Sequence, residues 1–257
     1  MGTTEIIISL IGGFFAGILN SLAGFGSIIT LAIYTDVIGI PGHIANATNR
    51  VNVMASSSVT SLTFYKNGKL DFKGAKWIIS SVFVGALIGV LMAIQLDADG
   101  FKTAFKFLLP PIFIILLVNP KRFINPDFSV PETSKFITIP LYFLMGIYAG
   151  FIQAGFGVMF LMVAVMMSKY DIIVGNGVKI ATVAFYTAGA IVIFHFNGMI
   201  IWKAGIALAI GQALGGYLAA RNMTLLEGAS KWSYYLLLLI VFAVIVKNFE
   251  MWTWFGL

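Results

Sequence analysis

The chain has 257 residues, of which 60% are hydrophobic and only 10% are charged, and its mean hydropathy is +0.97. Soluble domains carry about 25% charged residues, so this composition excludes an ordinary soluble fold and indicates a membrane protein. The net charge of +6 is scattered without a stripe of basic and aromatic residues, which argues against nucleic-acid binding. The absence of cysteine excludes disulfides and thiolate metal sites.

Apolar segments follow one another along the chain. In order they cover 4–20, 24–38, 44–65, 75–95, 101–118, 136–153, 156–168, 172–196, 204–220 and 232–247. A helix rises about 1.5 Å per residue and a bilayer core is about 30 Å thick, so the segments at 24–38 and 156–168 are short for a full crossing. The sequence predicts an all-α polytopic membrane protein in which these two segments are short or re-entrant broken helices.

A long polar stretch lies near the middle of the chain, at residues 121–134, and contains Pro126 and Pro131 among charged side chains. Such a composition is typical of a linker. We therefore expect a first membrane repeat at 1–120 and a second at 135–257. Pro110-Pro111, inside the segment at 101–118, predicts a kink.

A four-residue motif relates the two halves. Ala-Gly-Phe-Gly occurs at 23–26 and again at 154–157, each time between two apolar stretches. At spacings of 129 to 131 residues the alignment pairs Arg50 with Lys179, Asn67-Gly68 with Asn197-Gly198, Lys73 with Lys203 and Gly85 with Gly215. Repeats of about five segments with glycine interruptions at matching positions are typical of secondary transporters, and the interruptions point to the binding site.

Basic residues predict the orientation, because cytoplasmic loops carry the excess of lysine and arginine. Four lysines lie between residues 66 and 76, so this loop is predicted to be cytoplasmic. Alternation from that loop places ten basic residues inside and three outside. Both termini are then expected outside. The corresponding loop of the second half, 197–202, also falls outside, which predicts that the two repeats are inverted.

Three basic residues, Arg50, Lys106 and Lys179, lie within the apolar segments and away from their ends. Lys106 has no basic counterpart in the second half and is expected to extend toward the outer surface, which leaves Arg50 and Lys179. A cation at bilayer depth costs about 2.5 to 3.5 kcal/mol on insertion scales, so it normally has a partner or lines a cavity. One interpretation pairs these residues with Asp36 and Asp171 at segment ends. The other leaves both cations for a small anion, and their repeat-related positions favour it.

The glycine motifs fit an anion site as well. Glycine tolerates positive φ and close approach of a ligand, and a helix that restarts after the break presents free N–H groups to an oxyanion. The alternative is that the motif only allows close helix packing. The predicted substrate-binding residues are Arg50, Lys179, Asn49, Asn176, Gly24, Phe25, Gly26, Ser27, Gly155, Phe156 and Gly157. No metal or cofactor is expected, since His43 and His195 lack metal-ligand spacing.

These motifs carry a family resemblance. They are Ala16-Gly17 to Gly26, Ala45 to Arg50, Tyr65 to Asp71 and Gly85, then Gly150 to Gly157, Gly175 to Lys179 and Asn197-Gly198. With them the chain resembles the sulfite exporter family (TauE/SafE) over nearly its whole length, departing at Phe25, where the family often has glycine. The resemblance implies a bacterial inner-membrane protein that moves sulfite, sulfonates or related anions out of the cytoplasm, and it implies a homodimer.

The combined prediction is a transporter that exports sulfite or a related small sulfur-containing anion by alternating access between two inverted repeats. Its expected partners are the anion and the lipid bilayer. An anion channel, or a transporter of a different small organic or inorganic anion, remains an alternative. A potassium-type filter is disfavoured because no Thr-Val precedes Gly-Phe-Gly. An enzyme is not expected, since no catalytic set stands out.

Overall fold

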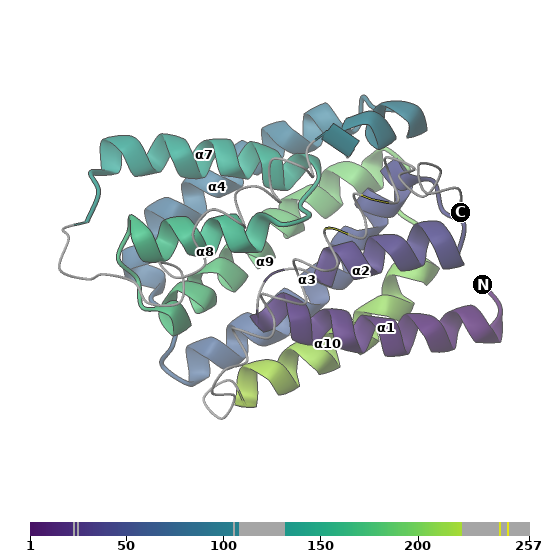
Figure 1. Cartoon of the computed structure of the whole chain (residues 1–257), viewed down its shortest axis with the longest axis horizontal. Helices are drawn as coiled ribbons and strands as arrows, with labels where there is room; N and C mark the ends of the chain where they lie inside the picture. Colours follow the sequence, from purple (N-terminus) through teal and green to yellow (C-terminus); the bar gives the residue numbers. More distant parts are fainter. Residues whose placement is uncertain are drawn as a thin grey trace.

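The computed structural model describes residues 1–22, 24, 26–104, 106–107, 132–222, 242 and 246. Within these residues the chain forms helices and no β-strand (Figure 1), which confirms the predicted all-α class. The elements are α1 (Thr3–Leu22), α2 (Gly26–Ala32), the π-helix η1 (Ile33–Val37), α3 (Gly42–Lys66), α4 (Phe72–Ala93), α7 (Lys135–Phe151), α8 (Phe156–Met166), α9 (Ile172–Phe196) and α10 (Trp202–Asn222).

The predicted segments correspond to these helices within a few residues, and the segment at 172–196 coincides with α9. The predicted short segments are α2 with η1, and α8, which has 11 residues. Most of the segments at 101–118 and 232–247, the predicted kink at Pro110-Pro111 and most of the linker lie outside the described residues.

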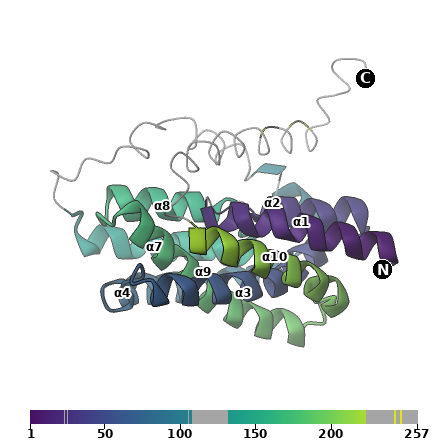
Figure 2. The same cartoon turned by 90° about the horizontal axis from the view of Figure 1, so that it is seen from below.

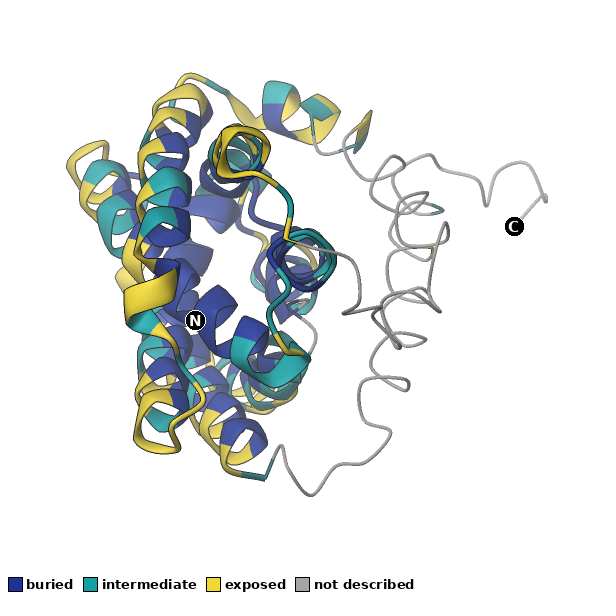
Figure 3. Ribbon diagram, turned by 90° about the vertical axis from the view of Figure 1, so that its left-hand side faces the viewer, coloured by how far each residue is buried: buried dark blue, intermediate teal, exposed yellow. Residues whose placement is uncertain are grey.

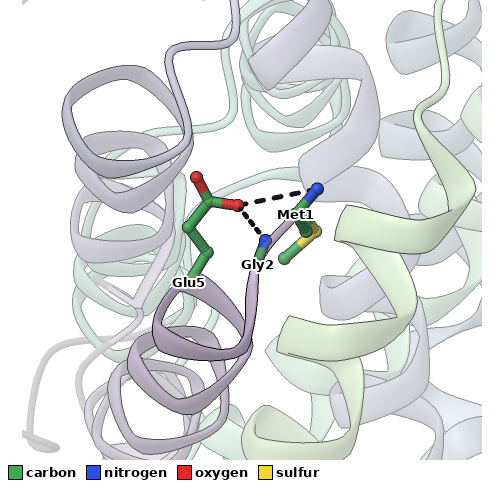
Figure 4. Close-up of polar contacts among 3 residues, drawn as sticks. All are labelled: Met1, Gly2 and Glu5. Atoms are coloured by element: carbon green, nitrogen blue, oxygen red, sulfur yellow. Dashed lines mark hydrogen bonds and ion pairs between the residues drawn. The ribbon is translucent and has the colours of Figure 1, made fainter.

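Polar side chains fix where several helices begin. Asp71 precedes α4 and accepts a hydrogen bond from the Gly74 N–H at 2.9 Å, and Asp171 does the same for the start of α9. At the start of α1, Glu5 accepts from the Gly2 N–H at 2.8 Å and lies 3.6 Å from the terminal ammonium of Met1 (Figure 4). Acceptors at these positions satisfy N–H groups that have no partner within the helix.

Two helix pairs, α1 with α10 and α4 with α7, are joined by glycine. Each of the four helices carries Gly-x-x-x-Gly, at Gly13 and Gly17, Gly211 and Gly215, Gly85 and Gly89, and Gly146 and Gly150. A Cβ placed on Gly17 would lie 2.2 Å from the carbonyl oxygen of Gln212, and one on Gly89 would lie 2.0 Å from that of Ile147. The backbones therefore touch, as small-residue motifs in membrane helices permit.

The direction of each pair follows from the same contacts. In one pair Gly13 meets Leu208 and Gly17 meets Gln212, so residue numbers rise together and α1 runs parallel to α10. The second pair shows the same order, with Gly85 against Phe143 and Gly89 against Ile147, so α4 runs parallel to α7. The two pairs thus use one packing scheme.

The helices α3 and α9 form the centre of the bundle and run antiparallel. Gly177, near the start of α9, packs on the carbonyl of Lys69 just after α3 ends. Conversely, Thr48 near the start of α3 accepts a hydrogen bond from the Ile201 N–H, after α9 ends, at 3.1 Å. Figure 2 shows α2 and α8 on one side of the bundle and α3 and α4 on the other. The short helices therefore cover one face of the central pair.

The outer surface is apolar. Large exposed side chains include Phe15 of α1, Ile88 of α4, Leu144 of α7 and Leu214 of α10, and Figure 3 shows buried residues turned toward the centre. Three of the described helices, α1, α4 and α9, are long and apolar enough to cross a membrane. The helix α3 has 25 residues and is more polar than these three. Many of its polar side chains are buried between other helices. An apolar exterior around a polar centre is expected of a membrane protein.

The glycine contacts predict a specific sensitivity to added methyl groups. Gly89→Ala places a Cβ 2.0 Å from the Ile147 carbonyl oxygen, and we expect this overpacking to lower the free energy of unfolding by about 1 to 3 kcal/mol. Gly175→Ala is the matched control, since its nearest neighbour is an ordinary contact at 3.4 Å. Thermal melting of the purified protein in detergent measures both. Equal melting temperatures for the two variants would contradict the packing described.

Candidate functional site

The two glycine motifs are breaks in the membrane helices, and they lie against each other. Gly24 follows α1 with φ of +84°, and Gly155 precedes α8 with φ of +78°, so equivalent residues adopt the same left-handed conformation. A Cβ on Gly24 would lie 2.6 Å from the Cα of Gly157. The breaks of the two halves therefore meet in backbone contact.

The break leaves carbonyl groups at the end of α7, and α3 of the other half satisfies them. Arg50 donates from Nη1 to the carbonyl of Ala149 and from Nη2 to that of Gly150, each at 2.8 Å. Asn46, one turn earlier, donates to the carbonyl of Phe151 at 2.8 Å. A cation at a helix C-terminus is also favoured by the helix dipole.

The end of α1 is bound in the equivalent way by α9. Lys179 donates from Nζ to the carbonyl of Asn20 at 3.3 Å, and Asn176 donates to that of Ser21 at 2.6 Å. Among the described residues neither Arg50 nor Lys179 has an ion-pair partner. The interpretation that pairs them with aspartates therefore fails within these ranges. Each central helix instead caps the broken helix of the opposite half.

The two buried cations differ in the number and length of their hydrogen bonds. Arg50 is completely buried and lies 5.8 Å from the ring centroid of Phe194. It makes two short hydrogen bonds to carbonyls and a third, at 3.4 Å, to the side-chain oxygen of Asn46, while its Nε has no hydrogen-bond partner among the described residues. Lys179 is 1% exposed and makes one long hydrogen bond. An ammonium has three N–H donors, so Lys179 retains hydrogen-bonding capacity that its single protein contact does not use.

Lys179 lines a small cavity between the halves. The cavity is lined by Asn20, Gly24, Ser27, Ser57, Gln153, Phe156, Gly157, Lys179, Ile180, Val183 and Tyr186. Its volume is about 10 Å³, measured as space for the centre of a water molecule, which is room for about one water. Since Phe156 and Gly157 form the first turn of α8, the positive end of that helix lies at the cavity.

The cavity brings together part of the predicted site. It contains Gly24, Ser27, Phe156, Gly157 and Lys179. Five other predicted residues do not line it, namely Arg50, Asn49, Asn176, Gly26 and Gly155. Phe25 lies outside the described residues. Gly26 serves helix packing, because a Cβ there would lie 2.1 Å from the carbonyl oxygen of Ala16.

Asn49 belongs to a second buried polar cluster. Its side-chain oxygen accepts from Thr30 at 2.5 Å and from Asn52 at 3.0 Å. Asn52 in turn accepts from Tyr34 at 2.7 Å and donates to Gln212. These hydrogen bonds connect α2 and η1 to α3 and α10. The second cluster therefore holds the short helix of the first half in place.

Six lining residues were not in the predicted set, and two of them, Ser57 and Tyr186, form a repeat-related pair. They stand 129 residues apart, the spacing that relates Arg50 to Lys179, and each follows its cation by seven residues on the same helix. Because seven residues are about two helical turns, this spacing could have identified them. Tyr186 accepts a hydrogen bond from Gln153 at 2.9 Å, which ties the second break to α9. No group of three or more potential metal ligands occurs in the part of the chain that is described.

The unequal contacts of the cations predict unequal effects on stability. Arg50→Met removes three hydrogen bonds of a charged donor, two of them short bonds to carbonyls, and leaves those buried carbonyls unpaired. A hydrogen bond to a charged group is worth about 1.5 to 3 kcal/mol. Lys179→Met removes one long hydrogen bond together with an unpaired buried charge, so we expect a loss of about 1 kcal/mol or less. Thermal melting in detergent separates the two. The capping account is wrong if Lys179→Met destabilises as strongly as Arg50→Met.

Known proteins agree with a transporter. The sulfite exporter TauE/SafE family model matches residues 9–247. Relatives described as probable membrane transporter proteins occur in a Sinorhizobium species, at 26% identity over 82% of this chain and 80% of the relative, and in Haemophilus influenzae, at 26% over 81% of each. The probable membrane transporter protein YfcA of Escherichia coli K12 is 22% identical over 80% of this chain and 76% of its own. No solved structure matches.

The family match spans nearly the whole chain, including both broken helices and both buried cations. The described helices expose large apolar side chains and bury polar ones, including Arg50 and Lys179, within a largely apolar core, as is common in membrane transporters. The chain therefore belongs to the sulfite exporter TauE/SafE family of membrane transporters.

Proposed function

We propose that this protein exports a small oxyanion, sulfite or a related sulfur-containing anion, through the cavity between its two halves. The observation that carries the proposal is Lys179, a cation that is buried without a carboxylate partner among the described residues. It lines a cavity together with Gly24 and Gly157 of the two glycine motifs. An anion in the cavity would supply the missing counter-charge, which offsets the desolvation of the ammonium.

The remaining lining supports an anion over a cation. The first turn of α8 brings the positive end of a helix, and Ser27 and Ser57 bring hydroxyl donors. No aspartate or glutamate is among the described lining residues. The oxygen acceptors of sulfite are all bonded to one sulfur atom, so several hydrogen-bond donors that converge on one point can bind it.

Alternating access is the proposed mechanism, because the cavity is too small for sulfite in this conformation. An oxyanion is larger than the single water that fits, so binding requires the contact between Gly24 and Gly157 to open. The parallel pairs on either side and the antiparallel central pair support two halves that are inverted relative to each other. In such transporters one repeat rocks against the other around a fixed site.

We assign different roles to the two cations. Lys179 contacts the substrate, whereas Arg50 positions the end of α7 and with it the break that precedes α8. Export of an anion from a cell with an inside-negative potential is favoured by about 2.3 kcal/mol per charge per 100 mV. A coupling cation is therefore not needed for outward movement.

Sulfite release from liposomes that contain the purified protein tests the function. Lys179→Gln keeps a polar side chain and removes the charge, so we expect release to fall at least about tenfold, the effect of about 1.4 kcal/mol. Lys203→Gln is the control, since Lys203 is exposed at the start of α10. Sulfate and thiosulfate serve as competitors.

The outcomes separate the site from the substrate. If the wild-type protein releases no sulfite but does release another of the tested anions, and Lys179→Gln blocks that release, the site stands and the substrate is different. If sulfite release is the same in Lys179→Gln and wild type, the assignment of Lys179 is wrong.

A further inference from the structure

An open groove lies at the end of the bundle where α3 joins α4. Its volume is about 640 Å³, and its lining runs from Ser58 and Leu62 on α3 to Phe72 and Lys73 at the start of α4. Ser58 and Tyr65, which also lines it, are seven residues apart, so the groove extends about 10 Å along α3. It is therefore an elongated surface site, separate from the cavity at Lys179.

The walls of the groove are aromatic and aliphatic. The ring of Phe72 packs edge-on against Tyr65, with centroids 6.0 Å apart, and against Phe185 of α9 at 6.1 Å. Leu62 and Tyr65 nevertheless remain 53% and 59% exposed. Aromatic side chains of this kind gather at the level of lipid headgroups. The groove thus has the lining that an acyl chain and its glycerol end would contact.

Lys73 and Asp71 line the groove at the start of α4, and three more lysines lie close to them in the sequence. Lys66, Lys69, Lys73 and Lys76 are all exposed and lie within eleven residues. The acidic residue among them, Asp71, also lines the groove, but its carboxylate accepts a hydrogen bond from the Gly74 N–H and caps α4. Within the described ranges none of the four lysines forms an ion pair. Their ammonium groups are therefore available to a phosphate.

The second half shows that this charge is not needed to form the turn. Gly68 and Gly198 occupy equivalent turns with the same φ of +66°. Where the first half has Lys66, Lys69 and Lys76, a spacing of 130 residues places Phe196, Met199 and Ile206 in the second. A bias of charge toward the cytoplasm would explain lysines on this loop. It would not explain why one of these lysines, Lys73, lines a groove with aromatic and aliphatic walls.

We propose that the groove between α3, α4 and α9 binds an anionic phospholipid, with the phosphate at Lys73 and Lys69 and an acyl chain along Leu62 and Tyr65. Juxtamembrane lysines attract anionic lipid headgroups, and Lys73 lines this groove with three other exposed lysines nearby in the sequence. The bound lipid would hold the end of α3, whose other turns carry Arg50 and Ser57. This inference does not depend on the transported anion.

Native mass spectrometry of the purified, delipidated full chain tests the proposal. We expect phosphatidylglycerol to bind more tightly than phosphatidylcholine of the same chain length. In the double variant Lys69→Gln/Lys73→Gln, the ratio of the affinity for phosphatidylglycerol to that for phosphatidylcholine should fall about fivefold for each lysine replaced. Lys203→Gln, at the equivalent position of the second half, is the matched control and should keep it. Phe72→Ala should weaken the binding of both lipids, since it removes part of the apolar wall.

Several outcomes would overturn the proposal. Equal binding of the two lipids to the wild-type protein would remove the role of charge. An equal loss in Lys203→Gln would show a general effect of positive charge and not a site. Full displacement of the lipid by inorganic phosphate or glycerol phosphate would identify a site for soluble phosphate. A double variant that melts like wild type without lipid, inserts in the same orientation and still prefers phosphatidylglycerol would place the lipid elsewhere.

Discussion

The structure depends on hydrogen bonds from each central helix to the broken helix of the opposite half. A helix that ends inside a membrane leaves carbonyl groups that neither water nor the helix itself can satisfy. Arg50 with Asn46 binds those of α7, and Lys179 with Asn176 binds those of α1. The breaks can therefore exist only when the two halves are assembled. The glycine contacts of α1 with α10 and of α4 with α7 then hold the halves together.

The hydrogen bonds at the two helix ends also distinguish the roles of the two buried cations. Arg50 and Lys179 occupy related positions, but arginine offers a planar fork that reaches two carbonyls at once, whereas a lysine ammonium makes a single contact here. Arg50 makes several hydrogen bonds within the fold, whereas Lys179 makes one and lines a cavity. Under the proposed function, Arg50 is the structural anchor of this pair and Lys179 is the ligand-binding group.

Much of the fold could be predicted from the sequence, because apolar length and glycine positions determine where membrane helices begin and break. The bounds of α9 and the two breaks at Gly24 and Gly155 follow from such local signals. The partners of Arg50 could not be predicted, since the carbonyls of Ala149 and Gly150 lie 99 and 100 residues away. Asn49 was expected beside its cation but faces the second cluster, because adjacent residues on a helix point in different directions.

The central claim is that Lys179 is a cation held ready for an anion, while Arg50 serves the fold. The most direct measurement is sulfite binding to the purified protein in detergent. The readout is the shift in melting temperature as sulfite is titrated. The account predicts a saturable upward shift in wild type, because a ligand that binds the folded state stabilises it, and no shift in Lys179→Met. A saturable shift of equal size in Lys179→Met would contradict it.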